Sequence, residues 1–583
     1  MKKIFVALFA VFCLSGCDLS KYQLVEEFDF ETVFEKSTGK ETATYPQVIE
    51  YYKQLGTAYP TIKLMEFGKT DSGEPLHLAV FSKGENFDFA QLREDHTIIL
   101  VNNGIHPGES DGIDATMMLF RDLAQDSVPV PKNTILATIP VYNIGGALNR
   151  NSSSRTNQNG PLEYGFRGNA RNYDLNRDFI KADTRNTRSF FEIFHLVQPD
   201  IFVDTHVSNG ADYQYTLTHL FTQKDKLGGE LGDYMDKRMK PSFEKSLWEH
   251  EWEITPYVNV FNEVPEKGFV QFLDSPRYST GYTTLWNTLG VMIETHMLKP
   301  YKERVKGTYR ALQTIIEIGE RDRATIKDLR ARAQRKYLTE RYYPLDFKAD
   351  SSTVSKLQFK GFEAKRVESD VTGEKRLEYD QSKPFTKEIE YYDNFIPTER
   401  IEIPRAYVIP KGWWNVLEIL KSNKVTMTPF KNDTTIMVEV SHIDDYSTRD
   451  KAYEGHYPHY NTSVKKTRDS IKFRKGDLYI KTFQPAVRYL IETLEPTAED
   501  SFFNWNFFDS ILQQKEGFSL YVFEDIAKKL LDENPDLKKE FDEKKRSDRE
   551  FSQNSYAQLS WIHKQSVHYE KAHLRYPVFR VSR

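Results

Sequence analysis

The chain has 583 residues, of which 39% are hydrophobic, 14% aromatic and 28% charged, and its formal net charge is −5. This length exceeds what a single hydrophobic core usually supports, so two or three folded domains are expected. Both signs of charge are mixed along the chain and provide no basic field for a phosphate backbone. Nucleic acid is therefore excluded as a leading partner, and the oligomeric state is not indicated.

The first residues are typical of an export signal. Two lysines precede an apolar run at residues 4–14 that is too short to span a bilayer. The run ends in Leu-Ser-Gly-Cys at Cys17, which resembles the lipobox of bacterial lipoproteins. The resemblance implies removal of residues 1–16 and a lipid on Cys17, which would anchor the protein to a cell-envelope membrane on its periplasmic or cell-surface side. Alternatively, Cys17 is an incidental residue of an ordinary cleaved signal.

Residues 45–340 are expected to form the first domain, after a polar tether at 17–44. Buried strands alternate there with helices, which predicts an α/β fold with a mixed, mostly parallel sheet covered by helices. Ligands of such sheets bind at the carboxyl ends of the strands. The predicted helices are 45–55, 111–123, 185–197 and a charged segment at 301–337, and the predicted strands are 62–68, 77–82, 97–102, 134–141, 200–205 and 289–295.

The composition changes after the first domain. Short β-type runs such as 406–410 and 435–440 predict a β-rich accessory domain at 341–480. The remainder, 481–583, is expected to be mostly helical. The sequence does not indicate a role for either part.

Three predicted strands end in side chains that suit a metal site. His106 and Glu109 follow the strand at 97–102, and His206 follows the strand at 200–205. A catalytic zinc site uses three such nitrogen and oxygen ligands and keeps one position open. Glu294 ends a third apolar strand, where burying a carboxylate is costly unless it has a function, such as that of a base.

In this order the residues resemble the M14 family of zinc carboxypeptidases, and the segment from Asp174 to Phe179, Asp-Leu-Asn-Arg-Asp-Phe, is similar to the Asp-x-Asn-Arg segment of that family. The resemblance covers roughly residues 45–337. It implies one Zn²⁺ per chain and a peptide substrate cleaved at its C-terminus, with Glu294 as the catalytic base.

The resemblance also implies roles around the metal. Asn176 and Arg177 would bind the terminal carboxylate of the substrate, and Asp174 would orient the first zinc histidine from behind. Asp204 could orient a ligand in the same way or be only structural. Arg155 is the candidate for stabilising the oxyanion, with Arg150 as a competitor.

The mobile active-site tyrosine of the family has two candidates here, Tyr278 and Tyr282. Neither spacing matches the family well, so the role stays open. Members of the broader family also hydrolyse other amides, so a peptidoglycan stem peptide is an alternative substrate.

Two other functions are weighed against this one. Residues 108–112 spell the Gly-x-Ser-x-Gly of a serine hydrolase, but in that motif the serine sits on a turn directly after the strand, and residues 103–107 intervene here. The other alternative is a non-catalytic lipoprotein that binds a polymer. Further histidines are more typical of loops and surfaces than of a second metal site: His456, His459, His563, His568 and His573.

Overall fold

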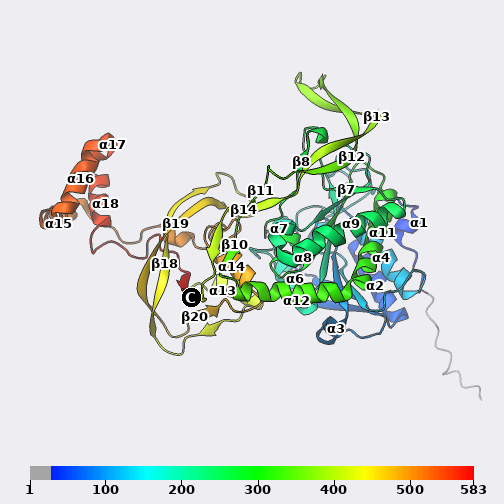
Figure 1. The fold of residues 1–583 in the computed structure, drawn as a ribbon, viewed down its shortest axis with the longest axis horizontal. Coiled ribbons are helices and arrows are strands. Elements are labelled where there is room, and N and C mark those ends of the chain that lie inside the picture. The colour runs from blue at the N-terminus through cyan, green and yellow to red at the C-terminus, as the bar shows by residue number, and fades with distance from the viewer. Residues whose placement is uncertain (1–27) are drawn as a thin grey trace, which may run out of the picture.

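The computed structural model describes residues 28–583. It contains a first domain, a second domain and a small helical lobe at the far end of the second (Figure 1). The predicted signal and Cys17 lie outside the described residues, so they stay predictions. Between residues 28 and 583, no helix is at once long and apolar enough to cross a membrane.

The first domain is built on an eight-stranded sheet with the order β1-β2-β4-β3-β5-β9-β6-β7. The pairs β4/β3, β3/β5, β5/β9 and β6/β7 are parallel, and the other three are antiparallel. This confirms the predicted mixed, mostly parallel sheet. The strands are β1 (Ile62–Lys69), β2 (Pro75–Phe81), β3 (Thr97–Asn102), β4 (Thr134–Ile139), β5 (Ile201–Ser208), β6 (Leu217–Phe221), β7 (Ile254–Pro256) and β9 (Leu289–His296).

Helices cover both faces of this sheet. Successive side chains of a strand point to opposite faces, so neighbouring residues of β5 contact helices on opposite sides. On β5, the backbone of Gly112 in α4 lies so close to the Thr205 hydroxyl that a Cβ there would clash, whereas Asp204 accepts a hydrogen bond from Ser279 of α10. The helices are α1 (Val33–Lys36), α2 (Tyr45–Ala58), α3 (Phe89–Asp95), α4 (Asp111–Ala124), α5 (Ile144–Leu148), α6 (Arg185–Val197), α7 (Lys224–Leu227), α8 (Gly229–Tyr234), α9 (Lys240–Glu249), α10 (Ser279–Thr284), α11 (Tyr301–Arg321) and α12 (Arg323–Thr339).

The charged segment predicted as one helix at 301–337 is two helices. Asp322 separates α11 from α12, with φ −100° and ψ 10°. Its buried carboxylate accepts hydrogen bonds from the Tyr234 hydroxyl at 3.0 Å and from Arg321 at 2.8 Å. These contacts offset the cost of burying the charge and fix the break.

Residues 28–44, predicted as part of a tether, pack on the first domain. Phe34 is buried against Tyr301, with ring centroids 5.7 Å apart. Glu35 accepts a hydrogen bond from Arg121 of α4 at 2.7 Å. This segment therefore covers the surface formed by α4 and the start of α11.

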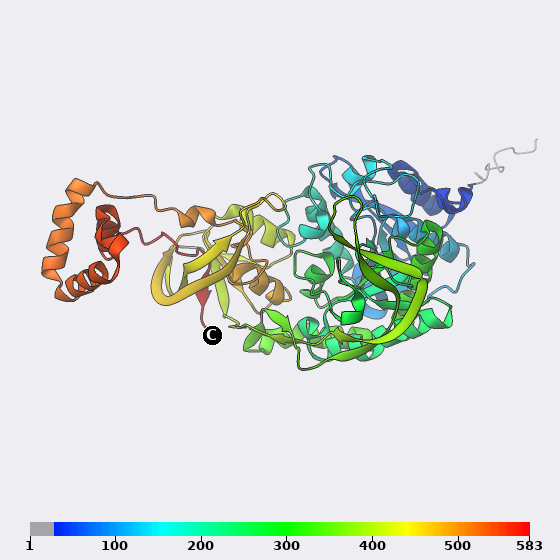
Figure 2. The same cartoon turned by 90° about the horizontal axis from the view of Figure 1, so that it is seen from above.

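The second domain is β-rich, and its sheet includes the last strand of the chain. Its six-stranded sheet has the order β17-β20-β16-β21-β18-β19, so β21 at the end of the chain lies between β16 and β18. Helices α15–α18 are inserted before β21 as a lobe joined to the sheet by two connections (Figure 2). The elements are β16 (Ala406–Ile409), α13 (Trp414–Ser422), β17 (Thr428–Pro429), β18 (Thr434–Thr448), β19 (His459–Phe473), β20 (Leu478–Lys481), α14 (Val487–Leu494), α15 (Leu520–Glu533), α16 (Pro535–Ser547), α17 (Arg549–Ser552), α18 (Ser555–Lys564) and β21 (Phe579–Val581).

A long hairpin lies between the two domains in the chain and projects from the first (Figure 1). Its strands pair with each other and, through the second strand, with β8 of the first domain. The remaining strands of this linking region form two short pairs. The strands are β8 (Phe269–Val270), β10 (Tyr342–Pro344), β11 (Phe347–Ala349), β12 (Ser355–Glu368), β13 (Lys375–Tyr392), β14 (Phe395–Pro397) and β15 (Arg400–Glu402).

Asp114 gives the first domain a pH-dependent stability. It is buried in α4, and burial raises the pKa of its carboxyl to about 7, although the Tyr301 hydroxyl opposes the shift. The folded chain therefore holds a proton that the unfolded chain loses near pH 4, so stability falls as the pH rises through this window.

We expect Asp114→Asn to stabilise the domain by about 2–4 kcal/mol at pH 8 and to have little effect at pH 4. The amide keeps the shape and an acceptor for Tyr301 but carries no ionisable proton. Thermal unfolding at several pH values measures the difference, with the exposed Glu94→Gln as the control. An unchanged pH dependence in Asp114→Asn would contradict this assignment.

Candidate metal centre

The sheet order brings the three polar strand ends together. Strands β3, β5 and β9 are adjacent and parallel, so their carboxyl ends meet at one edge. His206 of β5 and Glu294 of β9 are direct register partners. His106 and Glu109 lie in the loop that joins β3 to α4.

This loop is held by buried polar contacts. The Asn103 side chain donates to the hydroxyls of Thr116 and Thr138 at 3.0 and 3.1 Å and accepts from Thr205 at 2.8 Å. Gly108 allows a close approach, because a Cβ there would lie 2.3 Å from Arg155 Nε. The loop is thereby fixed to both neighbouring strands before α4 begins.

His106, Glu109 and His206 present donor atoms to one point. His106 Nδ1 lies 3.2 Å from Glu109 Oε1, and His206 Nδ1 lies 2.9 Å from Glu109 Oε2. All three side chains are buried, and one donor atom from each lies within 4.8 Å of the others. Within residues 28–583, this is the one group of potential ligands that converges so closely.

The ring nitrogens that point away from this centre face carboxylates. His106 Nε2 lies 3.0 Å from Asp174 Oδ1, and His206 Nε2 lies 3.0 Å from Asp204 Oδ2. A carboxylate at Nε2 favours the proton on that nitrogen and leaves the Nδ1 lone pair available. Two imidazoles and a carboxylate arranged in this way fit the ligands that zinc prefers.

The pKa shifts reflect the crowding of these charges. Burial opposes ionisation of Glu109, but His106, Arg155 and His206 hold the pKa of its carboxyl well below the usual range. Burial also opposes a charge on His206, but Asp204 and Glu109 raise its pKa well above the usual value. The centre thus keeps Glu109 ionised.

Glu294 lines the same cavity, which has a volume of about 330 Å³. Burial raises the pKa of its carboxyl to about 8; His206 opposes the shift, while Glu109 and Asp204 add to it. Other side chains reach this cavity from several loops and strands: His106, Glu109, Arg167, Asn176, Arg177, His206, Tyr257, Phe261, Phe272, Tyr278 and Met292.

Arg155 and Arg167 occupy different positions around the candidate metal ligands. Arg155, predicted to face the oxyanion, donates to the metal-ligand candidate Glu109 at 2.7 Å and lines a neighbouring cavity. Arg167 lines the cavity that holds Glu294 and lies 2.8 Å from Asp174. Sequence reasoning missed Arg167, and its position seven residues before Asp174 was the available signal. Arg150 binds backbone carbonyls of residues 42, 43 and 163 instead.

The predicted carboxylate-binding residues lie together at the rim of the cavity. Asn176 and Arg177 both line it, and Asn176 Oδ1 accepts from the backbone N–H of Ser279 at 3.1 Å. The Arg177 guanidinium lies 4.4 Å from the centroid of the Tyr278 ring. Tyr278 is therefore part of this group.

Tyr282 lies elsewhere. Its side chain is fully buried, and its hydroxyl donates to Asn423 of the second domain at 2.6 Å. Its ring stacks on Phe191. It is therefore a core residue and does not line the cavity. Tyr257, which the sequence did not suggest, lines the cavity instead.

Ser110, the serine of the alternative hydrolase motif, is the N-cap of α4. It is fully buried, and its hydroxyl donates to the Pro107 carbonyl at 3.0 Å. A nucleophile needs a base within hydrogen-bonding reach and access to substrate. The position of Ser110 disfavours the serine hydrolase.

The other histidines have separate partners. His456 contacts Asp183 at 2.7 Å, and His459 contacts Asp509 at 3.0 Å. His563 packs between Phe518 and Phe523. His573 contacts the Tyr569 hydroxyl at 2.5 Å. Among the described residues, His568 is not part of a group that could hold a metal ion.

Comparison with known proteins gives the following result. No family model matches the chain, and no curated protein matches it. Among solved structures, it is similar to a metallo-carboxypeptidase from Burkholderia cenocepacia, with 15% identity over 48% of this chain and 69% of that one and a TM-score of 0.36. Carboxypeptidase A from Helicoverpa armigera has 13% identity over 50% of this chain and 74% of that one, with a TM-score of 0.37. A Pseudomonas aeruginosa metallo-carboxypeptidase in complex with (2-guanidinoethylmercapto)succinic acid has 12% identity over 47% of this chain and 69% of that one, with a TM-score of 0.35. All three of these solved structures are carboxypeptidases.

Proposed function

We propose that this protein is a zinc-dependent carboxypeptidase that removes residues from the C-terminus of peptides. The observation that carries the proposal is the convergence of His106, Glu109 and His206 on one point of a cavity that Glu294 and Arg177 also line. The cavity combines a metal-ligand set, a candidate base and a guanidinium suited to a carboxylate.

One Zn²⁺ would be held by His106 Nδ1, His206 Nδ1 and the Glu109 carboxylate. When bound, the ion supplies Lewis-acid polarisation of the scissile carbonyl and lowers the pKa of water towards about 7. Asp174 holds the His106 ring through a hydrogen bond at 3.0 Å, and the Asp204 carboxylate lies 3.0 Å from His206 Nε2. Arg155 holds the Glu109 carboxylate.

Glu294 is proposed to act as the base. Its carboxyl lines the cavity and has a raised pKa, so it binds a proton more readily than an exposed glutamate. It would accept a proton from the attacking water and deliver that proton to the leaving amine. A cation held by the neighbouring ligands would lower this pKa and favour the ionised carboxylate that acts as the base.

Arg167 is proposed to stabilise the developing oxyanion. Two of its nitrogens contact Asp174, at 3.0 and 2.8 Å, which fixes the guanidinium beside the metal ligands. The side chain is 47% exposed and lines the cavity. A preorganised donor of this kind acts most strongly where charge develops in the transition state.

Asn176 and Arg177 are proposed to bind the terminal carboxylate. An arginine can hold a carboxylate through two parallel hydrogen bonds. The side chains that line the cavity near them include Phe261, Phe272 and Met292, which suit an apolar terminal side chain.

We expect His206→Ala to lose most of the bound metal, because one of three ligands is removed. Elemental analysis should find about one zinc per chain in the wild type and far less in the variant. The exposed His250→Ala is the matched control and should keep its zinc. Equal zinc content in all three proteins would place the metal elsewhere.

We expect Glu294→Gln to lower kcat by about 10²–10⁴-fold or more with about one zinc per chain retained, because the amide cannot accept the proton. The substrate is a peptide with an apolar C-terminal residue, and mass spectrometry reads its ends. The same peptide with an amidated C-terminus should be a poor substrate of the wild type. Glu303→Gln, at a half-buried position of α11 outside the cavity, is the control.

Three outcomes would overturn the proposal. Full activity of Glu294→Gln would remove the proposed base. A wild type that binds no zinc and cleaves no peptide would favour the non-catalytic binding protein. Labelling of Ser110 by a fluorophosphonate would favour the serine hydrolase.

The two arginines should differ in effect. Arg167→Gln removes the proposed oxyanion donor and should lower kcat by about 10²-fold or more at unchanged zinc content. Arg155→Gln removes the partner of Glu109 and should weaken zinc binding by about 10–100-fold. Steady-state kinetics and zinc titration read the two effects separately. If Arg155→Gln lowered kcat and Arg167→Gln weakened zinc binding, the oxyanion role would instead belong to Arg155.

A further inference from the structure

The loop between β18 and β19, residues 449–458, reaches from the second domain to the segment of the first that carries Arg177. Its tip is closed by two backbone hydrogen bonds between Tyr453 and His456, at 2.8 and 3.1 Å. Gly455 has φ +79°, and a Cβ there would lie 2.5 Å from the Tyr173 hydroxyl. The glycine therefore permits both the turn and the close approach to the first domain.

Three consecutive contacts join this loop to the segment that carries Arg177. Arg177 Nε donates to the Tyr453 hydroxyl at 3.0 Å, and the backbone N–H of Asp174 donates to Glu454 at 2.8 Å. His456 contacts Asp183 at 2.7 Å. The loop is thus bound to the same residues that were assigned to the terminal carboxylate and to the first histidine.

The loop is itself anchored in the second domain. The Tyr453 ring stacks on Trp505, with centroids 6.1 Å apart and planes at 18°. Trp505 is 1% exposed and donates to Asp500 at 3.1 Å. Its rigid ring fixes the position of the Tyr453 hydroxyl.

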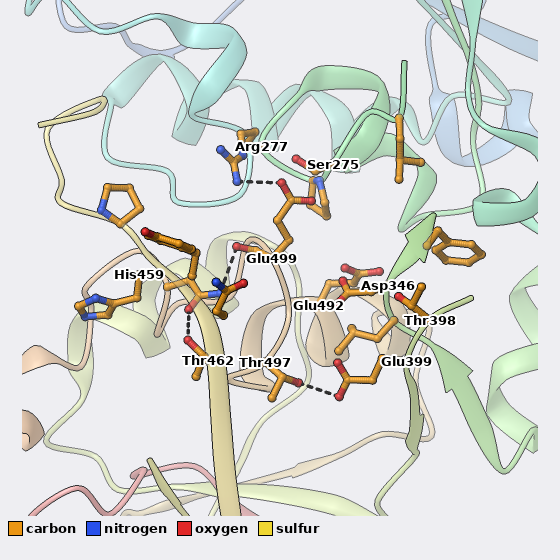
Figure 3. Close-up of a pocket in the computed structure, with 18 of the residues that line it drawn as sticks. Ser275, Arg277, Asp346, Thr398, Glu399, His459, Thr462, Glu492, Thr497 and Glu499 are labelled. Atoms are coloured by element: carbon orange, nitrogen blue, oxygen red, sulfur yellow. Dashed lines mark hydrogen bonds and ion pairs between the residues drawn. The ribbon is translucent and has the colours of Figure 1, made fainter. Parts of the chain in front are cut away.

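The other neighbour of Arg177 is also tied to the second domain. Tyr278, which lies against the guanidinium, follows Arg277, and Arg277 donates to Asp500 at 2.8 Å. Figure 3 shows Arg277 of the first domain paired with Glu499 of the second, at 3.2 Å, in the lining of a cavity of about 530 Å³. Both flanks of Arg177 therefore depend on contacts between the domains.

Arg177 has few other restraints. Its Nη1 donates to the carbonyl of Asn176, and Asp174 lies 3.9 Å away. Fixing an arginine side chain costs rotamer entropy. Fixing it before substrate arrives transfers that cost from binding to folding.

We propose that the second domain completes the carboxylate subsite of the first, and that Tyr453 is the positioning residue that orients Arg177. The inference rests on the proposed function, because it assigns Arg177 to the terminal carboxylate. The Nε of Arg177 is held by Tyr453 and its Nη1 by the Asn176 carbonyl, which leaves Nη2 for the substrate. The accessory domain is then a part of the binding site.

The test compares Tyr453→Phe with Tyr457→Phe in the full chain. Tyr457 belongs to the same loop, and its side chain is 55% exposed. We expect Tyr453→Phe to raise KM for a free-acid peptide by about 5–30-fold, with kcat and zinc content unchanged. Tyr457→Phe should behave as the wild type. Equal KM values for the two variants, or a loss of kcat with loss of zinc, would overturn the inference.

A binding measurement separates this inference from the proposed function. The probe is N-acetyl-phenylalanine, with its amide as the control, titrated calorimetrically into the zinc-loaded proteins. Tighter binding of the acid, weakened about 5–30-fold in Tyr453→Phe, would support the subsite even if the wild type cleaved no peptide. Equal affinity of wild type and Tyr453→Phe for the acid would overturn the inference while leaving hydrolysis intact. Failure of the wild type to distinguish acid from amide would overturn the subsite in both proposals.

Discussion

The site depends on keeping the buried carboxylate of Glu109 ionised. A lone buried charge of this kind costs several kcal/mol, so it persists only when partners compensate it. Here His106 and His206 lie on its two oxygens, Arg155 donates to one, and the backbone N–H of Val207 donates to the other at 3.0 Å. The contacts that hold Glu109 therefore also set the positions of both histidines.

The fold supplies these partners from separate parts of the chain. Adjacent parallel strands bring His106, His206 and Glu294 to one edge, and the loop before α6 adds Asp174 and Arg167. Burial raises the pKa of Glu294, and the neighbouring carboxylates of Glu109 and Asp204 add to the shift. Several carboxylates this close together also favour binding of a divalent cation.

Much of this was predictable from local sequence. Thr97–Asn102 and Arg185–Val197 have the predicted bounds, because continuous apolar runs and helical periodicity are local signals. The metal-ligand set follows from residue types at strand ends. The sequence suggested Arg155, with Arg150 as competitor, for the oxyanion and did not single out Arg167, because all three lie in a long loop whose path is set by tertiary contacts such as Asn151 to Tyr164.

Long-range pairing was beyond the sequence. Nothing local places β21, at the end of the chain, between β16 and β18, or brings Tyr453 to Arg177 across 276 positions. Tyr282 illustrates the same limit, because its position beside Tyr278 gives no sign that its side chain enters the core. Contacts between the domains, which no periodicity encodes, decide the outer part of the site.

We propose that zinc is held by two histidines and one glutamate. X-ray absorption spectroscopy of the zinc-loaded protein tests these ligands, since nitrogen and oxygen ligands lie at about 2.0–2.2 Å and sulfur at about 2.3 Å. We expect scattering from two imidazole rings and no sulfur. Scattering from a single imidazole, from none, or from sulfur would contradict it.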